Sequence, residues 1–419
     1  MSHNVLLFPE LEKYLRETRG TGIFPSQKIV EFIDKGRIRA SAPITDVQIQ
    51  PASLDLRLGP VAHRVRASFL PGKNSTVDEK VRDLGMTDVD LREGAVFEKY
   101  CTYIVPLMEE LTLPEDISGK ANPKSTTGRL DIFTRLITDY GTGFEQVGEG
   151  YSGKLFLEVM PRTFSVRLQT GMRLNQLRFV RGKPQPLREQ FSLGKLHNQE
   201  PLVYSGDDQP GASEFHGGLP ISLDLTGFAD SPIVGYKAKS HAPLIDLSKV
   251  DYDDPDEFWE PIHSSRRIIL NPGDFYILIS KEKVSIPPDL AGVMTEIDTT
   301  MGEFRIHYAG FFDPGFGYDL EQGKGTRAVL EVRSPTVSRW SPGRGTRASG
   351  SRGSWPRFRA SAPRGWSGGR SAASSRPSPG APPSSRATPV PFIPPWRRGR
   401  RRRHINGRCR RMAAGSGRR

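Results

Sequence analysis

The sequence predicts a mainly β protein made of two tandem copies of one domain, with a short N-terminal helix and a disordered C-terminal tail. Three observations support this prediction. Most of the chain consists of short alternating apolar and polar runs separated by Gly, Pro, Asn and Asp, a pattern typical of strands and turns. Three sequence blocks recur in the same order at nearly one offset. The composition then changes abruptly after Glu331, the last acidic residue of the chain.

The first regular element is a short helix near the N-terminus. Residues 27–36 read QKIVEFIDKG, and Ile29, Val30 and Ile33 fall along one helical face. Gly36 is a typical helix stop. Because the runs that follow are short and alternating, we expect this helix to be the longest in the chain.

The body of the chain contains an internal duplication. Equivalent positions lie 169 or 173 residues apart, for example Glu158 and Glu331. The paired blocks are ASLDLRLG (52–59) with ISLDLTG (221–227), TLPEDISGKANPKSTTGRL (112–130) with SIPPDLAGVMTEIDTTMGEF (285–304), and KLFLEVMPR (154–162) with AVLEVRSP (328–335). Three ordered matches predict two copies of one β domain. The domain boundaries that we expect are an extension at 1–19, repeat 1 at 20–190, a linker at 191–214, repeat 2 at 215–335 and a tail at 336–419.

The tail has a different composition from the body. Residues 341–419 contain 20 Arg and no Lys, Asp or Glu, so the net charge of +13 leaves −7 for the first 340 residues. Gly, Pro, Ser and Ala dominate the remainder, and such a segment cannot bury enough surface to offset its ordering entropy. Three interpretations stay open: an arm that binds nucleic acid through phosphates, a disordered tail with non-specific binding only, or an out-of-frame translation of a GC-rich gene.

Several classes of protein are excluded by what the sequence lacks. Two cysteines cannot form a disulfide framework or a four-cysteine zinc site, and no H-x-E with P-C-x-x-C is present, which excludes a zinc-dependent deaminase. GEGYSG (148–153) leads into a strand, so it predicts a hairpin turn and not a dinucleotide site. No apolar run approaches 18 residues, so we expect no membrane segment and a cytoplasmic protein.

Three motifs could carry chemistry. PKSTTGR (123–129) combines cations, hydroxyls and a Gly, which suits phosphate binding, although a solvated turn is the alternative. Glu158 and Glu331 each lie in an apolar strand, which would raise a carboxyl pKa for proton transfer; an exposed face or a buried ion pair is the alternative. HYAGFFDPGFG (307–317) predicts a hairpin that closes over a flat base, or an ordinary turn.

Together these motifs resemble the dCTP deaminase family of the trimeric dUTPase superfamily, in a long form with two fused repeats. SLDLRLG is similar to the family's N-terminal element, LPEDISGKANPKSTTGRL to its phosphate loop, HYAGFFDPGFG to its base-binding hairpin, and LFLEV and VLEVR to the strand that bears its catalytic glutamate. The resemblance covers about residues 20–335 and implies two domains of the β-clip, or distorted jelly-roll, type.

The resemblance also implies roles for individual residues. Ser125 falls on the loop serine, and Glu158 and Glu331 both fall on the catalytic glutamate. The implied triphosphate ligands are Lys124, Ser125, Thr126, Thr127, Gly128 and Arg129, and the implied base or sugar contacts are Thr138, Ala309 and Asp313. Lys124 replaces an arginine of the family pattern, which changes a planar fork into a point charge.

Each repeat departs from the family pattern in a different place. Repeat 1 keeps the phosphate loop, but its hairpin is longer and has Gly148 where the aspartate should be. Repeat 2 keeps the hairpin with Asp313, but its loop lacks the Ser and the Arg. We therefore predict one composite site that combines 124–129 with Ala309, Asp313 and Glu331, while Glu158 is vestigial or structural. The two repeats would pair within one chain or between copies in a homo-oligomer.

The implied activity is hydrolysis of dCTP to dUTP and ammonia by a Glu-activated water, with Mg²⁺ bound to the triphosphate and no zinc. One alternative is a dUTP diphosphatase, or a bifunctional enzyme, in which Asp313 activates water. The alternative of another class is a non-catalytic nucleic-acid-binding protein that acts through the Arg-rich tail. Since that tail begins where repeat 2 should have its closing strands, we also expect those strands to be missing and strand edges to be unpaired.

Overall fold

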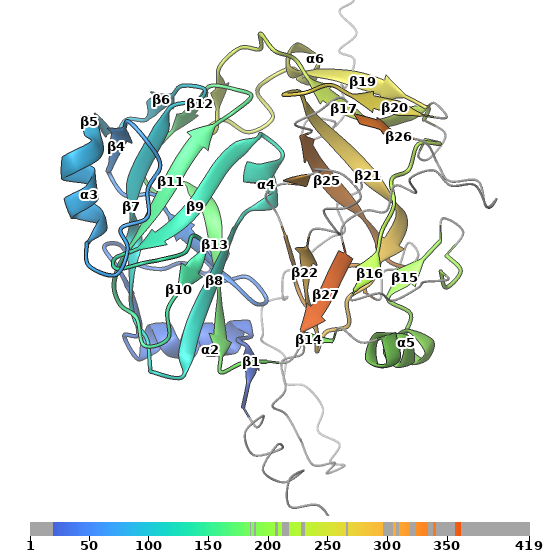
Figure 1. The fold of residues 1–419 in the computed structure, drawn as a ribbon, viewed down its shortest axis with the longest axis horizontal. Helices are drawn as coiled ribbons and strands as arrows, with labels where there is room; N and C mark the ends of the chain where they lie inside the picture. Colours follow the sequence, from blue (N-terminus) through green and yellow to red (C-terminus); the bar gives the residue numbers. More distant parts are fainter. Residues whose placement is uncertain are drawn as a thin grey trace, which may run out of the picture.

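The fold is that of two β bodies in one chain (Figure 1). The computed structural model describes residues 20–184, 186–187, 190–205, 208–211, 218–227, 231–264, 267–295, 305–306, 310–318, 324–333, 338–340 and 357–361. Strands predominate in this part of the chain, which confirms the mainly β prediction. The extension at 1–19 and most of the Arg-rich tail lie outside the described residues.

Repeat 1 is built from two main antiparallel sheets that enclose an apolar core. One sheet has the order β1 (Gly22–Ile23), β13 (Arg173–Arg181), β8 (Ile117–Pro123), β10 (Gln146–Val147), with β3 (Leu54–Arg57) also on β13. The other has the order β5 (Gly85–Asp90), β4 (Val61–Val65), β7 (Thr102–Thr112), β11 (Ser152–Pro161), β9 (Ile132–Thr138), with β2 (Ile38–Ala40) also on β7. Leu54 and Leu177 from the first sheet and Leu157 from the second belong to one buried cluster. A small pair, β6 (Ala95–Phe97) and β12 (Val166–Leu168), lies beside them.

Repeat 2 has the same strand order, strand for strand, which confirms the duplication. Its first sheet runs β14 (Pro186–Leu187), β27 (Arg357–Ser361), β22 (Ala291–Thr295), β24 (Phe311–Phe312), with β16 (Leu219–Pro220) on β27. Its second sheet runs β19 (Trp259–His263), β17 (Ile233–Ala238), β21 (Phe275–Val284), β25 (Thr326–Arg333), β23 (Arg305–Ile306), with β15 (Val203–Tyr204) on β21. The small pair is β20 (Ile268–Leu270) with β26 (Ser338–Trp340).

The predicted N-terminal helix is present as α2 (Ser26–Asp34) and ends where expected. Gly36 has a φ of +65° and its N–H donates to the carbonyl of Ile33. Two details of the prediction were wrong. Val30 is 40% exposed, because the buried face is centred on Ile29 and Phe32. The longest helix in the described part of the chain is α5 (Gln190–Gln199), which is one residue longer than α2. The other short helices are η1 (Asp46–Gln48), α3 (Val77–Leu84), α4 (Ser125–Gly128) and α6 (Pro255–Phe258).

The stretch 191–214 is more than the linker that we predicted. It contains most of α5 and all of β15, and β15 pairs with β21 of repeat 2. Leu193, Leu202 and Val203 are buried in the core of repeat 2. These apolar side chains therefore make the segment part of the second fold, whereas its Gly- and Asp-containing sequence suggested a connection.

Two short strands of the predicted tail are among the described residues. Within 336–419, β26 pairs with β20, and β27 pairs with β22, β14 and β16. These strands occupy the places of β12 and β13 of repeat 1, so the closing strands that we expected to be missing are present in the described residues. Backbone pairing with exposed strand edges requires no particular side chain, which is why composition was a poor guide here.

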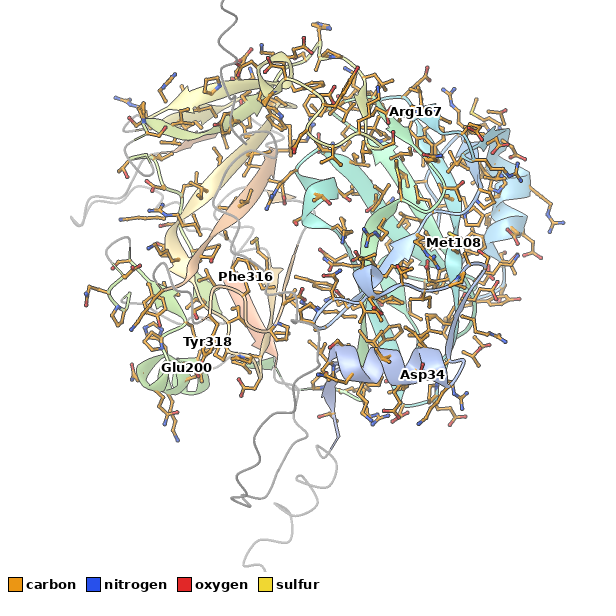
Figure 2. All side chains as sticks on the ribbon, turned by 180° about the vertical axis from the view of Figure 1, so that it is seen from behind. Asp34, Met108, Arg167, Glu200, Phe316 and Tyr318 are labelled. Carbon is orange, nitrogen blue, oxygen red and sulfur yellow. The ribbon has the colours of Figure 1, made fainter. Side chains whose placement is uncertain are left out.

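The two repeats are joined by an apolar interface. The ring of Phe164 in repeat 1 makes edge contacts with Phe258 and Trp259 of repeat 2, with centroids 5.7 and 5.4 Å apart. In addition, β12 pairs in parallel with β18 (Ile245–Asp246), and Arg167, which is labelled in Figure 2, contacts Asp246 at 3.3 Å. The repeats are thus paired within one chain. No helix of the described residues is long and apolar enough to cross a membrane.

Candidate functional site

The motif PKSTTGR forms a single helical turn, α4, between β8 and β9. The N–H of Gly128 donates to the carbonyl of Lys124, and the N–H of Arg129 to that of Ser125, both at 3.0 Å. Ser125 and Thr126 are exposed, and Lys124 and Arg129 are partly exposed. Figure 1 shows α4 on the side of repeat 1 that faces β25 of repeat 2. The turn therefore carries two partly exposed cations and two exposed hydroxyls on the side of repeat 1 that faces repeat 2.

Two predicted triphosphate ligands are instead part of the support of this turn. Thr127 is 2% exposed, and its Oγ1 donates to the carbonyl oxygen of Leu174 on β13 at 2.8 Å. The backbone N–H of Lys124 reaches the same carbonyl at 3.0 Å. Gly128 is buried beside Thr127. The Thr127 hydroxyl thus anchors the loop to β13 and is turned away from solvent.

Lys124 is held by a buried carboxylate beneath the loop. Its Nζ pairs with Oδ2 of Asp55, which is 0% exposed, and Nη1 of Arg173 lies 3.5 Å from the same oxygen. Burial raises the pKa of Asp55; Lys124 and Arg173 act in the opposite direction, and Asp313 adds to the increase. The same strand β13 that carries Arg173 also carries Arg178, which binds Asp313 of the repeat 2 hairpin at 2.9 Å.

The hairpin of repeat 2, described over 310–318, lies against repeat 1. The N–H of Gly310 donates to Oδ1 of Asn122 on β8 at 2.6 Å, and Nη2 of Arg178 on β13 donates to Oδ1 of Asp313 at 2.9 Å. Phe312 and Phe316, the latter labelled in Figure 2, stabilise the hairpin by an edge contact at 4.9 Å. Asp313 is therefore brought to the sheet that carries the loop, while Ala309 lies outside the described residues.

Glu331 lies on the face of β25 that is turned toward repeat 1. It is 3% exposed, and Val329, two residues before it, packs against an apolar cluster to which both repeats contribute. Arg333, two residues after it, pairs with Asp131 through Nη2 and donates to Thr163 Oγ1 at 2.9 Å. Alternate residues of a strand share one face. The Asp131 N–H donates to the Gly128 carbonyl at the end of α4, so the strand face that Glu331 shares with Arg333 is fixed to repeat 1 beside the phosphate loop.

Glu158, the equivalent residue of repeat 1, has a different environment. It is 1% exposed, and its Oε1 accepts hydrogen bonds from Nε and Nη2 of Arg135 at 3.0 and 2.7 Å. The Arg135 guanidinium also stacks over the ring of Phe144 at 3.5 Å. Phe156, on the same strand face, packs in a cluster composed only of repeat 1 side chains. Glu158 is thus in a buried ion pair on a face away from repeat 2.

Thr138 and the hairpin of repeat 1 lie on strands of repeat 1: Thr138 ends β9, and β10 pairs with β8, the strand that leads into the phosphate loop. Thr138 pairs with Leu155 in β11, and its carbonyl accepts from the N–H of Gly141. Burial raises the pKa of Glu145 to about 8, although a hydrogen bond from Asn175 at 3.3 Å acts to lower this pKa. Glu145 had no signal in the sequence, because it lies in an irregular turn.

Four further residues of the site were not predicted: Asp55, Asn122, Arg178 and Arg333. Asp55 belongs to the block ASLDLRLG, which in the sequence only indicates the duplication. A signal for Arg178 was available, since an arginine inside the apolar run of β13 must find a partner when buried. The signal for Arg333 was its two-residue spacing from Glu331. In the described part of the chain, no group of three or more His, Cys, Asp or Glu side chains is placed to hold a metal ion.

Comparison with known proteins gives a consistent result. The family models for the N-terminal and the C-terminal domain of 2'-deoxycytidine 5'-triphosphate deaminase match residues 20–183 and 189–339. The "dCTP deaminase, dUMP-forming" of Parafrankia sp. (strain EAN1pec) is 34% identical over 149 residues, which are 35% of this chain and 69% of that protein. That of Kocuria rhizophila is 28% identical over 198 residues, 46% and 95% of the two chains.

A solved structure is similar over both repeats. The crystal structure of 2'-deoxycytidine 5'-triphosphate deaminase from Agrobacterium tumefaciens has 43% sequence identity and a TM-score of 0.75. The alignment covers 82% of this chain and 99% of that chain.

Proposed function

The chain belongs to the 2'-deoxycytidine 5'-triphosphate deaminase family, and we propose that it hydrolyses the amino group of dCTP at the composite site between its two repeats. The observation that supports this proposal is the Arg333–Asp131 pair, which fixes the strand face shared by Glu331 and Arg333 to repeat 1 just after the loop at 124–129. Loop, hairpin and glutamate then act on one nucleotide.

The triphosphate would be held by the exposed part of α4. Lys124 and Arg129 supply the charge, and Ser125 and Thr126 supply hydroxyl donors. Nε of Arg129 is buried with no hydrogen-bond partner among the described residues, so a donor remains for an anion. Thr127 and Gly128 act by shaping the turn.

Mg²⁺ fits this site as a companion of the nucleotide. The donors around α4 are cations and hydroxyls, which suit phosphate oxygens better than a metal ion. The ion would therefore be held by the phosphate oxygens and water, where it neutralises part of the triphosphate charge. No step of the proposed reaction requires a protein ligand to a metal, zinc included.

The proposed chemistry is general acid–base catalysis by one carboxylate. Glu331 removes a proton from water, whose oxygen attacks C4 of cytosine, and Ser125 helps to position that water. The carboxyl then passes the proton to the departing amino group, so dCTP and water give dUTP and ammonia. Asp313 and its hairpin would hold the base and sugar.

Paired variants of the two glutamates test this assignment. Glu331→Gln removes the base without changing the shape of the side chain, and we expect ammonia release to fall at least 100-fold. Glu158→Gln weakens the ion pair with Arg135, so we expect lower stability with ammonia release retained. Loss of ammonia release only in the Glu158 variant would refute the composite site.

A second candidate concerns the product. Several relatives are named dUMP-forming, including those from Parafrankia and Kocuria rhizophila. A bifunctional enzyme would release dUMP, pyrophosphate and ammonia, with Asp313 activating water; in the structure one of its oxygens accepts from Arg178. Measuring ammonia, dUTP, dUMP and pyrophosphate from dCTP and from dUTP separates the two candidates, because a deaminase alone leaves dUTP intact.

Nucleic-acid binding by the Arg-rich tail stays a prediction, as does a cytoplasmic location. The nucleic-acid prediction requires binding that weakens steeply with salt and disappears when the tail is removed. Deamination that survives such a truncation would make the tail accessory to the enzyme.

A further inference from the structure

Arg178 is a buried arginine of repeat 1 whose partners all come from repeat 2. It lies on β13 and is 1% exposed. Nη1 donates to the carbonyl of Gly292 at 3.0 Å, and Nη2 donates to the carbonyl of Phe312 at 3.0 Å and to Asp313 Oδ1 at 2.9 Å. Its Cζ lies 4.0 Å from the ring centroid of Phe311.

These contacts bridge the two strands that form the hairpin side of repeat 2. Gly292 on β22 and Phe312 on β24 are opposite each other in the strand register, and one guanidinium binds both carbonyls. Burial lowers the pKa of Arg178, and Asp313 acts in the opposite direction. A buried charge is tolerated only when it is paired and hydrogen-bonded, so the position of the hairpin is tied to this side chain.

A second contact ties the same hairpin to the strand that leads into the phosphate loop. Asn122, which accepts from the N–H of Gly310, stands two residues before Lys124 on the β8 side of the loop. Arg178 is opposite Lys120 in the pairing of β13 with β8. Both contacts therefore start from the sheet on which the loop is anchored through Leu174.

We propose that Arg178 is a positioning residue that sets the hairpin of repeat 2 at a fixed place relative to the triphosphate loop of repeat 1. It acts through Asp313 and the hairpin backbone and does not itself touch the substrate. One nucleotide is then bound at both ends, at its phosphates by repeat 1 and at its base by repeat 2. This inference rests on the proposed function of the composite site.

The test separates binding of the base from binding of the phosphates. Arg178→Met removes the fork, and Arg178→Lys keeps the charge but not the planar geometry. Arg167→Met is the matched control, because Arg167 also links the repeats, but it does so from β12 to β18, in a different sheet from Arg178. The dissociation constants of dCTP and of inorganic tripolyphosphate, each with Mg²⁺, are measured by calorimetry on the full chain, together with kcat and KM.

We expect Arg178→Met to weaken dCTP binding at least tenfold and tripolyphosphate binding less than twofold. Arg178→Lys should recover part of the loss, and Arg167→Met should leave both constants unchanged. If Arg178→Met does not fold, Asn122→Ala and Arg178→Lys provide the same ratio. Equal losses for the two ligands, or unchanged dCTP binding in a folded variant, would overturn the inference. A wild-type protein that releases no ammonia from dCTP would instead refute the proposed function.

Discussion

Breaking the Arg333–Asp131 pair should destabilise the contact between the repeats and slow catalysis together. The Arg333 side chain is 9% exposed and that of Asp131 is 0% exposed. Nη1 of Arg333 also bonds the carbonyl of Gly273 in the turn before β21, so the guanidinium joins repeat 1 to that turn of repeat 2. Arg333→Met keeps most of the apolar stem but leaves the Asp131 carboxylate buried without its cation.

Removing one partner of a buried pair costs about 3–5 kcal/mol. Thr163 Oγ1 still donates to Asp131 Oδ2 at 2.5 Å, so we expect the lower end, about 3 kcal/mol. Asp131→Asn in the Arg333→Met background removes the buried charge and should recover about 1–2 kcal/mol. Since Arg333 shares its strand face with Glu331, a shift of that strand should also lower kcat by about 10- to 100-fold.

The stability changes are measured by urea unfolding of the wild type, both single variants and the double variant. Fluorescence of Trp259, which is 5% exposed at the interface between the repeats, reports on their separation. Ammonia release gives kcat for the same four proteins. A coupling energy below about 0.5 kcal/mol, or an unchanged kcat in folded Arg333→Met, would show that this pair does not set the position of Glu331.

Three further predictions concern other parts of the molecule. Because burial raises the pKa of Glu145 to about 8, the contribution of this group to stability is full below pH 4.5 and is lost as the pH rises through 8. Glu145→Gln should therefore reduce the loss of stability between pH 5 and pH 9 in urea unfolding, and an unchanged pH profile would contradict this. Gly317→Ala should cost more stability than Gly72→Ala. Both glycines have a positive φ, but a Cβ at Gly317 would clash with the carbonyl of Val284, whereas no atom lies within 4 Å of a Cβ at Gly72. Equal melting temperatures of the two variants would argue against the hairpin geometry. A chain that ends after residue 365 should keep its activity. A chain that ends after residue 345 loses β27 and exposes the edge of β22, so it should aggregate. Equal solubility of the two chains would refute a structural role for β27.

The repeat pattern could be recognised without a structure because it depends only on the local order of residues in the sequence. Strands show alternating apolar and polar residues, turns contain Gly, Pro or Asp, and duplicated blocks keep their sequence and spacing. The loop at 124–129, the hairpin with Asp313 and both glutamates were therefore predicted. The strand β27 was missed because backbone pairing leaves little trace in an Arg- and Gly-rich composition.

The sequence by itself determined the fold class, the duplication and the set of groups from which a site could be built. Only the tertiary structure decided which of those groups meet. Glu158 and Glu331 stand in equivalent strands with the same local pattern, yet Arg135 neutralises the first, and the second faces repeat 1. The difference comes from packing between residues about 200 positions apart, such as Arg333 with Asp131, and no local periodicity encodes contacts at that separation.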